Sequence, residues 1–385
     1  MRTSRGNRQG WILDRFLGGG ALDTLFRGSM GFFLQMGYQY VDIEKAATSA
    51  SSTGMLIKGF RQVAEEREAA AREAESKGNF LTARNEYHRA AKCYARGQWA
   101  VFDDGEKKRA LHGKCIECYA KVLEYNPTPI EKVEIAYAGG KLFGYLHLPR
   151  GVGPHPCVLF CPGLDMIKED FPNVELNILI ERGMAVLSLD GPGHGESRLD
   201  GGQFWQIPGM CEDNYGGAAT AAIDYLESRN EIDSTRIGVF GISQGSYWGP
   251  VMCAADRRLK ACAGLMGAFY EQGFDLGQPS FKENLMYMTG ASSEEEVDKI
   301  IPYITVDGLE DKLHCALLML HGEFDELTPE SDARMFIDRA VNAKPKELMI
   351  YENEFHPCGG VAPQAFGRVA DWMAQQLGAS PSGVA

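Results

Sequence analysis

The spacing of apolar residues changes part-way along the chain. Up to about residue 130 they recur every three or four positions, as at Tyr87, Ala91 and Tyr94, which is the spacing of one face of an α-helix. A Gly-Asn pair interrupts this pattern where one helix would end and the next begin. No repeat length is sustained, so a solenoid of helical repeats is not expected. We predict a helical region over residues 1–130, bounded by the proline-containing stretch "YNPTPIEK".

From residue 131 to 385, short apolar runs alternate with helical patterns, which predicts an α/β fold. Runs of this kind are typical of strands buried on both faces, so we expect a doubly wound, mostly parallel sheet that begins with a hairpin. A long excursion over about residues 268–312 is expected to form a lid. The expected strands are "KVEIAY", "KLFGYLHLP", "CVLFC", "AVLSLD", "RIGVF", "ACAGLM", "CALLML" and "LMIYE", and the expected helices include "NVELNILIERG", "GGAATAAIDYLESR" and "SDARMFIDRAV".

The stretch "RIGVFGISQGSYWGP" places a serine in a tight turn after a strand. Ser243 lies between Gly241 and Gly245, and a helix interrupted or bent at Pro250 is expected to follow. This is the arrangement of a nucleophile elbow, in which small flanking residues let the backbone turn sharply. The chain contains 45 glycines, so the motif alone does not distinguish a nucleophile from a turn serine. Whether Ser243 is a nucleophile therefore depends on whether the loops after the other strands contain a base and an acid for it.

Active sites in open α/β sheets lie beyond the carboxyl ends of the strands. His356 follows the last expected strand in a loop that contains Pro and Gly, and we expect it to be the base for Ser243. Asp325, shortly after the preceding strand, is expected to orient that base, with Glu323 as the alternative carboxylate. The chain order of serine, acid and histidine is typical of the α/β-hydrolase fold.

An attacked carbonyl develops negative charge on its oxygen, which requires hydrogen-bond donors. We expect the amide of Gln244, directly after the serine, to be one donor. Leu164 in "CPGLD" is expected to be the other, because Pro162 has no amide hydrogen. Asp165 and Lys168 would then line the mouth of the site or form an exposed salt bridge. The loop "LDGPGHGES" fits neither phosphate-binding motif, so we interpret it, with its histidine, as structural.

Composition narrows the classes of partner. The chain has 52 acidic and 39 basic residues, a net charge of −13, so binding to nucleic acid is not expected. No stretch is apolar enough to cross a membrane, and Asp14 and Arg15 interrupt the only candidate signal peptide. The ten cysteines are scattered, and the single Cys-x-x-Cys has no second pair, so we expect reduced thiols, no metal site and a cytoplasmic location.

Residues from about 130 to the end resemble the α/β-hydrolase superfamily. Within it they are similar to the branch that contains 2,6-dihydroxypseudooxynicotine hydrolase and the fungal polyketide-shortening C–C hydrolases. The helical stretch "KGNFLTARNEYHRAAKCYARGQW" resembles the same branch more weakly. The resemblance is carried by "VEIAYAGGKLFGYLHLPRGVGPHPCVLF", "ERGMAVLSLDGPGHGES", "RIGVFGISQG" and "LHGEFDELTP".

This resemblance implies a helical domain that covers the active site and contributes to a homodimer, and catalysis without a metal or organic cofactor. It also implies hydrolysis of a C–C bond beside a ketone, by a retro-Claisen reaction. Ser243, Asp325 and His356 match the positions of the family's triad. The family uses a further carboxylate after the sixth strand, for which Glu271 is the first candidate and Asp275 the second. The loop "CPGLD" departs from the Gly-Gly pair expected there.

Aromatic residues near the expected mouth favour a bulky, partly aromatic or polyketide-like small molecule as substrate, although they would serve equally to pack the lid onto the core. Phe204, Trp205 and Tyr247 are the candidates for contact with it. The same machinery would also serve a carboxylesterase or thioesterase, or a non-hydrolytic lyase, cyclase or dehydratase in polyketide tailoring. A non-catalytic binding protein on this fold is a further alternative.

Overall fold

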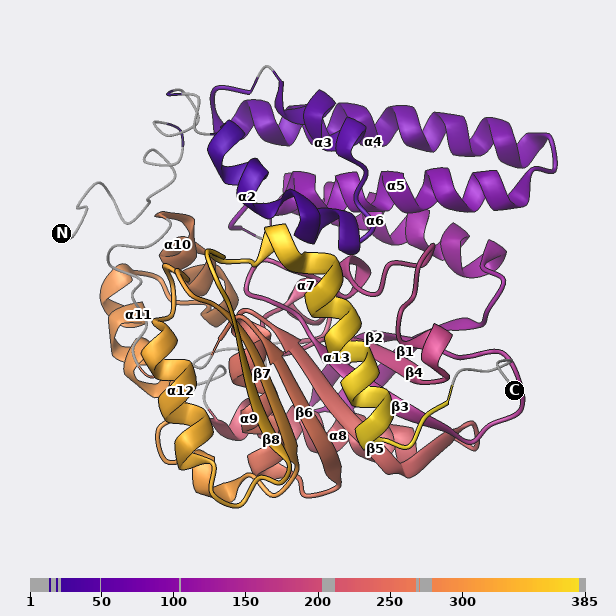
Figure 1. The fold of residues 1–385 in the computed structure, drawn as a ribbon. Helices are drawn as coiled ribbons and strands as arrows, with labels where there is room; N and C mark the ends of the chain where they lie inside the picture. The colour runs from indigo at the N-terminus through magenta and orange to yellow at the C-terminus, as the bar shows by residue number, and fades with distance from the viewer. Residues whose placement is uncertain are drawn as a thin grey trace.

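The computed structural model describes residues 22–48, 50–103, 105–202, 212–267 and 279–380, together with Asp14, Gly19 and Tyr270. Figure 1 shows a group of N-terminal helices that lies across one end of the strands of a sheet. The sheet itself is flanked by further helices. The N-terminal helices are α2 (Leu22–Gln35), α3 (Tyr40–Ala47), α4 (Thr53–Ser76), α5 (Phe80–Gln98) and α6 (Glu106–Tyr125).

Small residues explain how closely the N-terminal helices pack. Helix α5 contacts both α4 and α6 (Figure 1), and Ala64, Ala71, Ala83, Ala90 and Ala91 are completely buried between them. Alanine favours the helix and lets two helix axes approach, because its side chain ends at Cβ. The helical region expected from the sequence is confirmed.

The sheet has eight strands in the order β1-β2-β4-β3-β5-β6-β7-β8. The first two form the predicted antiparallel hairpin, β2 pairs antiparallel with β4, and all remaining neighbours are parallel. The predicted doubly wound, mostly parallel sheet is therefore confirmed. The strands are β1 (Ile130–Tyr137), β2 (Gly140–His147), β3 (His155–Cys161), β4 (Ala185–Asp190), β5 (Ile232–Ile242), β6 (Leu259–Leu265), β7 (Ala316–Gly322) and β8 (Lys346–Tyr351).

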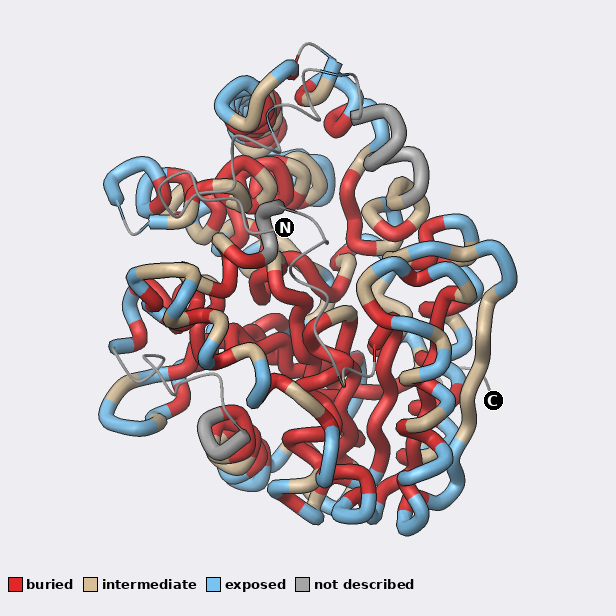
Figure 2. Tube along the Cα trace, turned by 90° about the vertical axis from the view of Figure 1, so that its left-hand side faces the viewer, coloured by how far each residue is buried: buried red, intermediate tan, exposed pale blue. Residues whose placement is uncertain are grey.

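Both faces of the sheet are covered, which explains why its central strands are apolar throughout. Successive side chains of β3 alternate between two cores: Leu159 and Cys161 pack with α8 and α9, whereas Val158 and Phe160 pack with α13 and α2. Figure 2 shows the buried residues concentrated along the strands. The helices after α6 are α7 (Gly195–Leu199), α8 (Glu212–Glu227), α9 (Gln244–Ala255), α10 (Pro279–Thr289), α11 (Glu294–Ile300), α12 (Glu330–Arg339) and α13 (Ala362–Gln376).

Two local predictions differ from the structure. The stretch "NVELNILIERG" forms turns and a short 3-10 helix (Ile180–Arg182) rather than an α-helix. Here the Asn177 side chain accepts hydrogen bonds from the amides of Leu179 and Ile180, and such local bonds compete with helix formation. Helix α9 is not interrupted at Pro250, which lies inside it, whereas the alternative of a bend there stays a prediction. In the part of the chain that the structure describes, no helix is both long and apolar enough to cross a membrane.

Candidate active site

Ser243 occupies a strained turn between β5 and α9. Its backbone has φ +54° and ψ −118°, a conformation that non-glycine residues rarely adopt and that costs about 1–3 kcal/mol. A Cβ on Gly241 would overlap the carbonyl of Gly245, and one on Gly245 would overlap the carbonyl of Cys161. The Ser243 amide donates to the carbonyl of Leu265 at 2.9 Å. Both glycines are therefore required by close backbone approach, as a nucleophile elbow demands.

The structure brings Ser243, His356 and Asp325 together from three separate loops. Nε2 of His356 lies 3.0 Å from Oγ of Ser243, and Nδ1 of the same ring lies 2.9 Å from Oδ2 of Asp325. The other carboxylate oxygen, Oδ1, accepts hydrogen bonds from the amides of Leu327 and Thr328 at 2.9 and 3.0 Å. Serine, imidazole and carboxylate thus form one continuous hydrogen-bonded path. Such a path can move a proton from the hydroxyl to the ring.

The alternative carboxylate lies elsewhere. Glu323 accepts a hydrogen bond from the backbone amide of Asn353 at 2.9 Å, and the ring of His356 contacts Asp325 instead.

The electrostatics of the site favour a basic imidazole. Burial opposes the charged form of His356, but the Asp325 carboxylate and its hydrogen bond outweigh this, so the pKa of His356 is raised above its ordinary value. For Asp325, burial again opposes the charge, but the nearby imidazole and the backbone amides hold the pKa of the carboxyl below its usual range. At neutral pH the carboxylate is ionised and can stabilise an imidazolium beside it.

The two backbone amides predicted as oxyanion donors lie near Ser243. Gln244 is the first residue of α9, and amides at a helix N-terminus have no partner within the helix. The loop that carries Leu164 lies against the elbow: a Cβ on Gly163 would be 3.5 Å from Cβ of Ser243. Within the described residues, no acceptor is found for the Leu164 amide. Both amides thus have no acceptor among the described residues, and their role as oxyanion donors stays a prediction.

The loop after β3 is also bound to the helical region. Asp165 accepts a hydrogen bond from Nη1 of Arg96 in α5 at 2.8 Å, and the guanidinium lies over the rings of Phe33 and Trp99 at 4.9 and 4.5 Å from the centroids. Contact with two ring faces favours a cation. Asp165 thus forms an ion pair that joins this loop to the helical region, and its predicted place at the mouth of the site stays a prediction.

Lys168 is neither exposed nor at the mouth, contrary to expectation. Its side chain is completely buried and its Nζ lies 2.7, 3.1 and 3.0 Å from carboxylate oxygens of Glu169, Asp190 and Glu196. A buried charge is tolerated only where it is paired. The three carboxylates provide that pairing and hold the loop on β4 and α7.

A second set of contacts crosses from the helices to the same loop. Nζ of Lys92, from α5, donates to the carbonyls of Glu169 and Asp170 at 2.7 and 2.6 Å. The hydroxyl of Tyr38 donates to Oδ1 of Asp170 at 2.8 Å. Lys92 is 1% exposed, so these bonds form in a buried interface.

Comparison with known proteins shows to which family this chain belongs. The family model described as esterase FrsA-like matches residues 52–293. This chain belongs to the FrsA-like family. The predicted resemblance to the 2,6-dihydroxypseudooxynicotine hydrolase branch of the α/β-hydrolases is also confirmed, by the relatives and solved structures that the chain matches.

Three relatives illustrate the similarity. The chain is 29% identical over 308 residues to 2,6-dihydropseudooxynicotine hydrolase of Paenarthrobacter nicotinovorans, a match that covers 78% of this chain and 80% of that protein. It is 27% identical over 313 residues to esterase FrsA of Klebsiella pneumoniae, covering 78% and 70%. It is 30% identical over 217 residues to the α/β-hydrolase xenA of Xenoacremonium sinensis, covering 54% and 49%.

Solved structures share the fold over nearly the whole chain. The crystal structure of 2,6-dihydroxy-pseudo-oxynicotine hydrolase superposes with a TM-score of 0.79 at 26% identity and covers 92% of this chain and 98% of that one. A structure of AbyA5 superposes with a TM-score of 0.68 at 15% identity, covering 94% and 95%. The second similarity concerns the fold alone.

Of the remaining predicted site residues of this FrsA-like chain, Tyr247 lies within the part of the chain that the structure describes. Tyr247 is completely buried and its hydroxyl donates to the carbonyl of Tyr303 at 3.3 Å, so its predicted contact with substrate stays a prediction. Phe204, Trp205 and Glu271, like the alternative Asp275, lie outside the described residues. In the described part of the chain, no cluster of three or more His, Cys, Asp or Glu side chains is arranged to hold a metal ion.

Two side chains beside the Leu164 loop were not expected at the site. Nδ2 of Asn284, in α10, donates to the carbonyl of Leu164 at 2.9 Å, and Nε2 of His194 lies 3.2 Å from the carbonyl of Gly163. His194 was interpreted only as a structural residue of its own loop. Asn284 carries no sequence signal, because its partner is 120 positions away.

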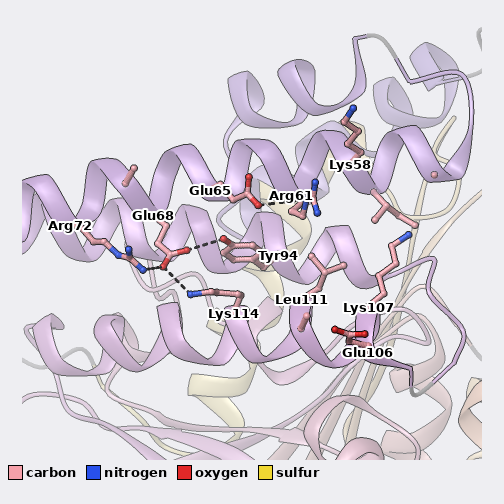
Figure 3. Close-up of a pocket in the computed structure, with 14 residues that line it drawn as sticks. Lys58, Arg61, Glu65, Glu68, Arg72, Tyr94, Glu106, Lys107, Leu111 and Lys114 are labelled. Carbon is pink, nitrogen blue, oxygen red and sulfur yellow. Dashed lines mark hydrogen bonds and ion pairs between the residues drawn. The ribbon is translucent and has the colours of Figure 1, made fainter.

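A well-defined groove of the FrsA-like helical region lies apart from the triad. It has a volume of about 850 Å³ and runs between α4 and α6 (Figure 3). Inside it Glu68 is bound by Tyr94, Arg72 and Lys114. None of the predicted site residues that the structure describes lines it; the described lining residues are Gly54, Ile57, Lys58, Arg61, Glu65, Glu68, Ala69, Arg72, Tyr94, Glu106, Lys107, Ala110, Leu111 and Lys114.

Proposed function

We propose that this chain is a serine-dependent hydrolase with Ser243, His356 and Asp325 as its catalytic triad. The observation that carries this proposal is the unbroken hydrogen-bonded path from the Ser243 hydroxyl to the Asp325 carboxylate, with distances of 3.0 and 2.9 Å. The strained elbow and the two free amides beside it support the same assignment. Membership of the FrsA-like family supports hydrolysis as the type of reaction.

In the proposed reaction His356 accepts the proton of Ser243 while Oγ forms a bond to the carbonyl carbon of the substrate. The carbonyl oxygen becomes negative and accepts hydrogen bonds from the amides of Gln244 and Leu164. Asp325 keeps the Nδ1 hydrogen in place and stabilises the imidazolium. The imidazolium then protonates the leaving group. Water, deprotonated by the same ring, attacks the acyl-enzyme and releases an acid and free Ser243.

We propose that the bond broken is a C–C bond beside a ketone in an aromatic or polyketide-like small molecule. Its electron pair would pass to the departing carbon, which His356 protonates, so that carbon must bear a group that stabilises a carbanion. Similarity over 78% of the chain to a protein named 2,6-dihydropseudooxynicotine hydrolase supports this choice. The helical region that lies across one end of the strands is proposed to act as the cap and to contribute to a homodimer.

A second candidate is ester or thioester hydrolysis by the same residues. The match to the model described as esterase FrsA-like favours it, since the triad itself is indifferent to whether an alkoxide, a thiolate or a carbanion leaves. The two candidates differ only in the leaving group, which is a stabilised carbanion in C–C cleavage and an alkoxide or thiolate in ester or thioester hydrolysis.

Product analysis in H₂¹⁸O tests both candidates. Wild type and Ser243→Ala are incubated with aryl β-diketones, aryl esters and acyl thioesters, and the products are identified by mass spectrometry. Cleavage of a diketone with ¹⁸O in the released acid, abolished in Ser243→Ala, is the expected result. Turnover of esters or thioesters alone would replace the C–C assignment by the second candidate. Conversion without ¹⁸O would indicate lyase or cyclase chemistry, and full activity of Ser243→Ala would refute the triad.

A further inference from the structure

The two peptide units on either side of Leu164 are held by side chains from outside their own loop. The carbonyl of Gly163 faces Nε2 of His194 at 3.2 Å, and the carbonyl of Leu164 accepts a hydrogen bond from Nδ2 of Asn284 at 2.9 Å. His194 directly precedes α7, whereas Asn284 comes from α10 in the excursion between β6 and β7. Both side chains are buried, with 2% and 7% of their surface exposed. Three separate segments therefore meet at the two peptide units on either side of Leu164.

These contacts fix the direction of the Leu164 amide. In a trans peptide the C=O and N–H bonds of one unit point in opposite directions. The carbonyl of Gly163 is held on one side by His194 and by the amide of Met166 at 3.1 Å, so the N–H of Leu164 is directed to the other side. Asn284 fixes the next carbonyl, and with it the following peptide plane. The amide is left with no acceptor among the described residues.

The protonation of His194 suits this role. A carbonyl oxygen only accepts, so Nε2 must carry the hydrogen. Burial lowers the pKa of His194 to about 4, which leaves the ring neutral at pH 7 with Nδ1 unprotonated. Nδ1 lies 2.9 Å from the hydroxyl of Tyr215, which is also 3.1 Å from the carbonyl of Pro192. The single hydroxyl hydrogen of Tyr215 can serve only one of these two acceptors, and the tautomer with hydrogen on Nε2 requires that it be donated to Nδ1. Tyr215 is stacked on Trp248 with 3.7 Å between ring centroids, so the hydroxyl beside Nδ1 is rigidly placed.

We infer that His194 and Asn284 are positioning residues that orient the Leu164 N–H as an oxyanion donor. The inference rests on the serine-hydrolase function proposed above. An oxyanion donor acts on charge that exists only in the transition state, so its orientation affects kcat rather than ground-state binding. Loss of either side chain is therefore expected to lower kcat and leave KM nearly unchanged.

The test compares His194→Leu, His194→Gln and Asn284→Leu with wild type. Leucine removes the donor at similar volume, whereas the glutamine amide can place a donor near the position of Nε2. Removal of a whole oxyanion donor lowers kcat by about 10²–10³-fold, and a misdirected one, still held by Met166, should lower it about 10–100-fold. KM should stay within about three-fold, and binding of an aryl boronic acid, which mimics the tetrahedral intermediate, should weaken by about the factor lost in kcat.

Controls separate orientation from general destabilisation. His147 is also a buried histidine, at 2% exposure, and belongs to β2 rather than to the Leu164 loop, so His147→Leu should keep kcat within about two-fold. Thermal unfolding checks that each variant is folded. If His194→Leu does not fold, Asn284→Leu decides, because α10 is not part of the sheet. His194→Gln should recover most of the lost kcat.

The outcomes distinguish this inference from the proposed function. If wild type does not react with a fluorophosphonate, or Ser243→Ala retains its activity, the serine-hydrolase proposal fails first. If turnover depends on Ser243 but both leucine variants keep wild-type kcat and boronate affinity, the positioning role is refuted. An equal rise in KM, or a loss that His194→Gln does not repair, would also refute it. A fall in kcat and boronate affinity at constant KM supports it.

Discussion

Replacing Asp325 by asparagine reverses the hydrogen-bond pattern of the triad while preserving its shape. In the structure Oδ1 accepts from the amides of Leu327 and Thr328, and Oδ2 faces Nδ1 of His356. An asparagine has one oxygen and one NH₂ group for these two places. The backbone amides only donate, so they require the oxygen. The NH₂ group must then face His356.

The structure fixes the size of this preference. Turning the amide the other way would leave two backbone N–H groups, those of Leu327 and Thr328, against an NH₂ donor. An unsatisfied buried donor costs about 1–3 kcal/mol, and here the Thr328 N–H is buried whereas the Leu327 N–H is partly buried, so the unfavourable orientation is disfavoured by at least about 1–3 kcal/mol. With NH₂ facing it, Nδ1 of His356 becomes the acceptor and Nε2 carries the hydrogen. Nε2 then cannot take the proton of Ser243, and kcat should fall about 10³–10⁴-fold.

The assay is kcat against pH for the substrate on which Ser243-dependent turnover is established, together with the rate of fluorophosphonate labelling. Asp325→Asn should lose both while its thermal unfolding stays close to that of wild type. Glu323→Gln, which changes a carboxylate two positions away that binds Asn353, is the matched control and should retain activity within about two-fold. A kcat for Asp325→Asn within ten-fold of wild type would mean that the tautomer of His356 does not depend on this residue.

Two further predictions concern protons. Because the pKa of His356 is raised above its ordinary value of about 6.5 and only the neutral ring accepts a proton, kcat/KM should fall on acidification with a midpoint above 6.5; a midpoint at or below 6.5 would contradict this. Burial lowers the pKa of His147 to about 3, so the unfolded chain takes up a proton between pH 7 and pH 4 that the folded state refuses. Between pH 7 and pH 4 this residue should lower the free energy of unfolding, measured with urea, by about 3 kcal/mol. The His147→Leu variant should lack this part of the pH dependence. If the free energy of unfolding falls by the same amount between pH 7 and pH 4 in the variant and in wild type, the prediction is wrong.

The proximity of the three residues of the proposed triad could be predicted because each follows a strand. Ser243, Asp325 and His356 come after β5, β7 and β8, and the carboxyl ends of parallel strands share one edge of the sheet. Apolar runs in the sequence identify such strands, and the glycines around Ser243 identify the tight turn. The order of these strands and loops can therefore be inferred from the sequence without knowledge of any tertiary contact.

Features that depend on partners distant in the chain could not be predicted. Lys168 reads as a surface residue, and only the structure reveals that Asp190 and Glu196 surround it. Asn284 is an ordinary helix residue until α10 meets the loop of Leu164. The failed helix over "NVELNILIERG" has a local cause, the side chain of Asn177, which binds two following amides. The spacing of apolar residues does not reveal a polar side chain that competes with the helix for backbone amides.

The buried contact between Lys92 and the loop at Glu169 and Asp170 has a consequence for how this protein can change over evolutionary time. An ammonium group that is 1% exposed depends on two carbonyls of the other layer, and those carbonyls depend on it. Recombination that exchanged the helices for those of another hydrolase would leave one side of this interface charged and unmatched, which is strongly destabilising. The helical layer and the sheet are therefore expected to be inherited together, with substitutions at one side followed by compensating substitutions at the other.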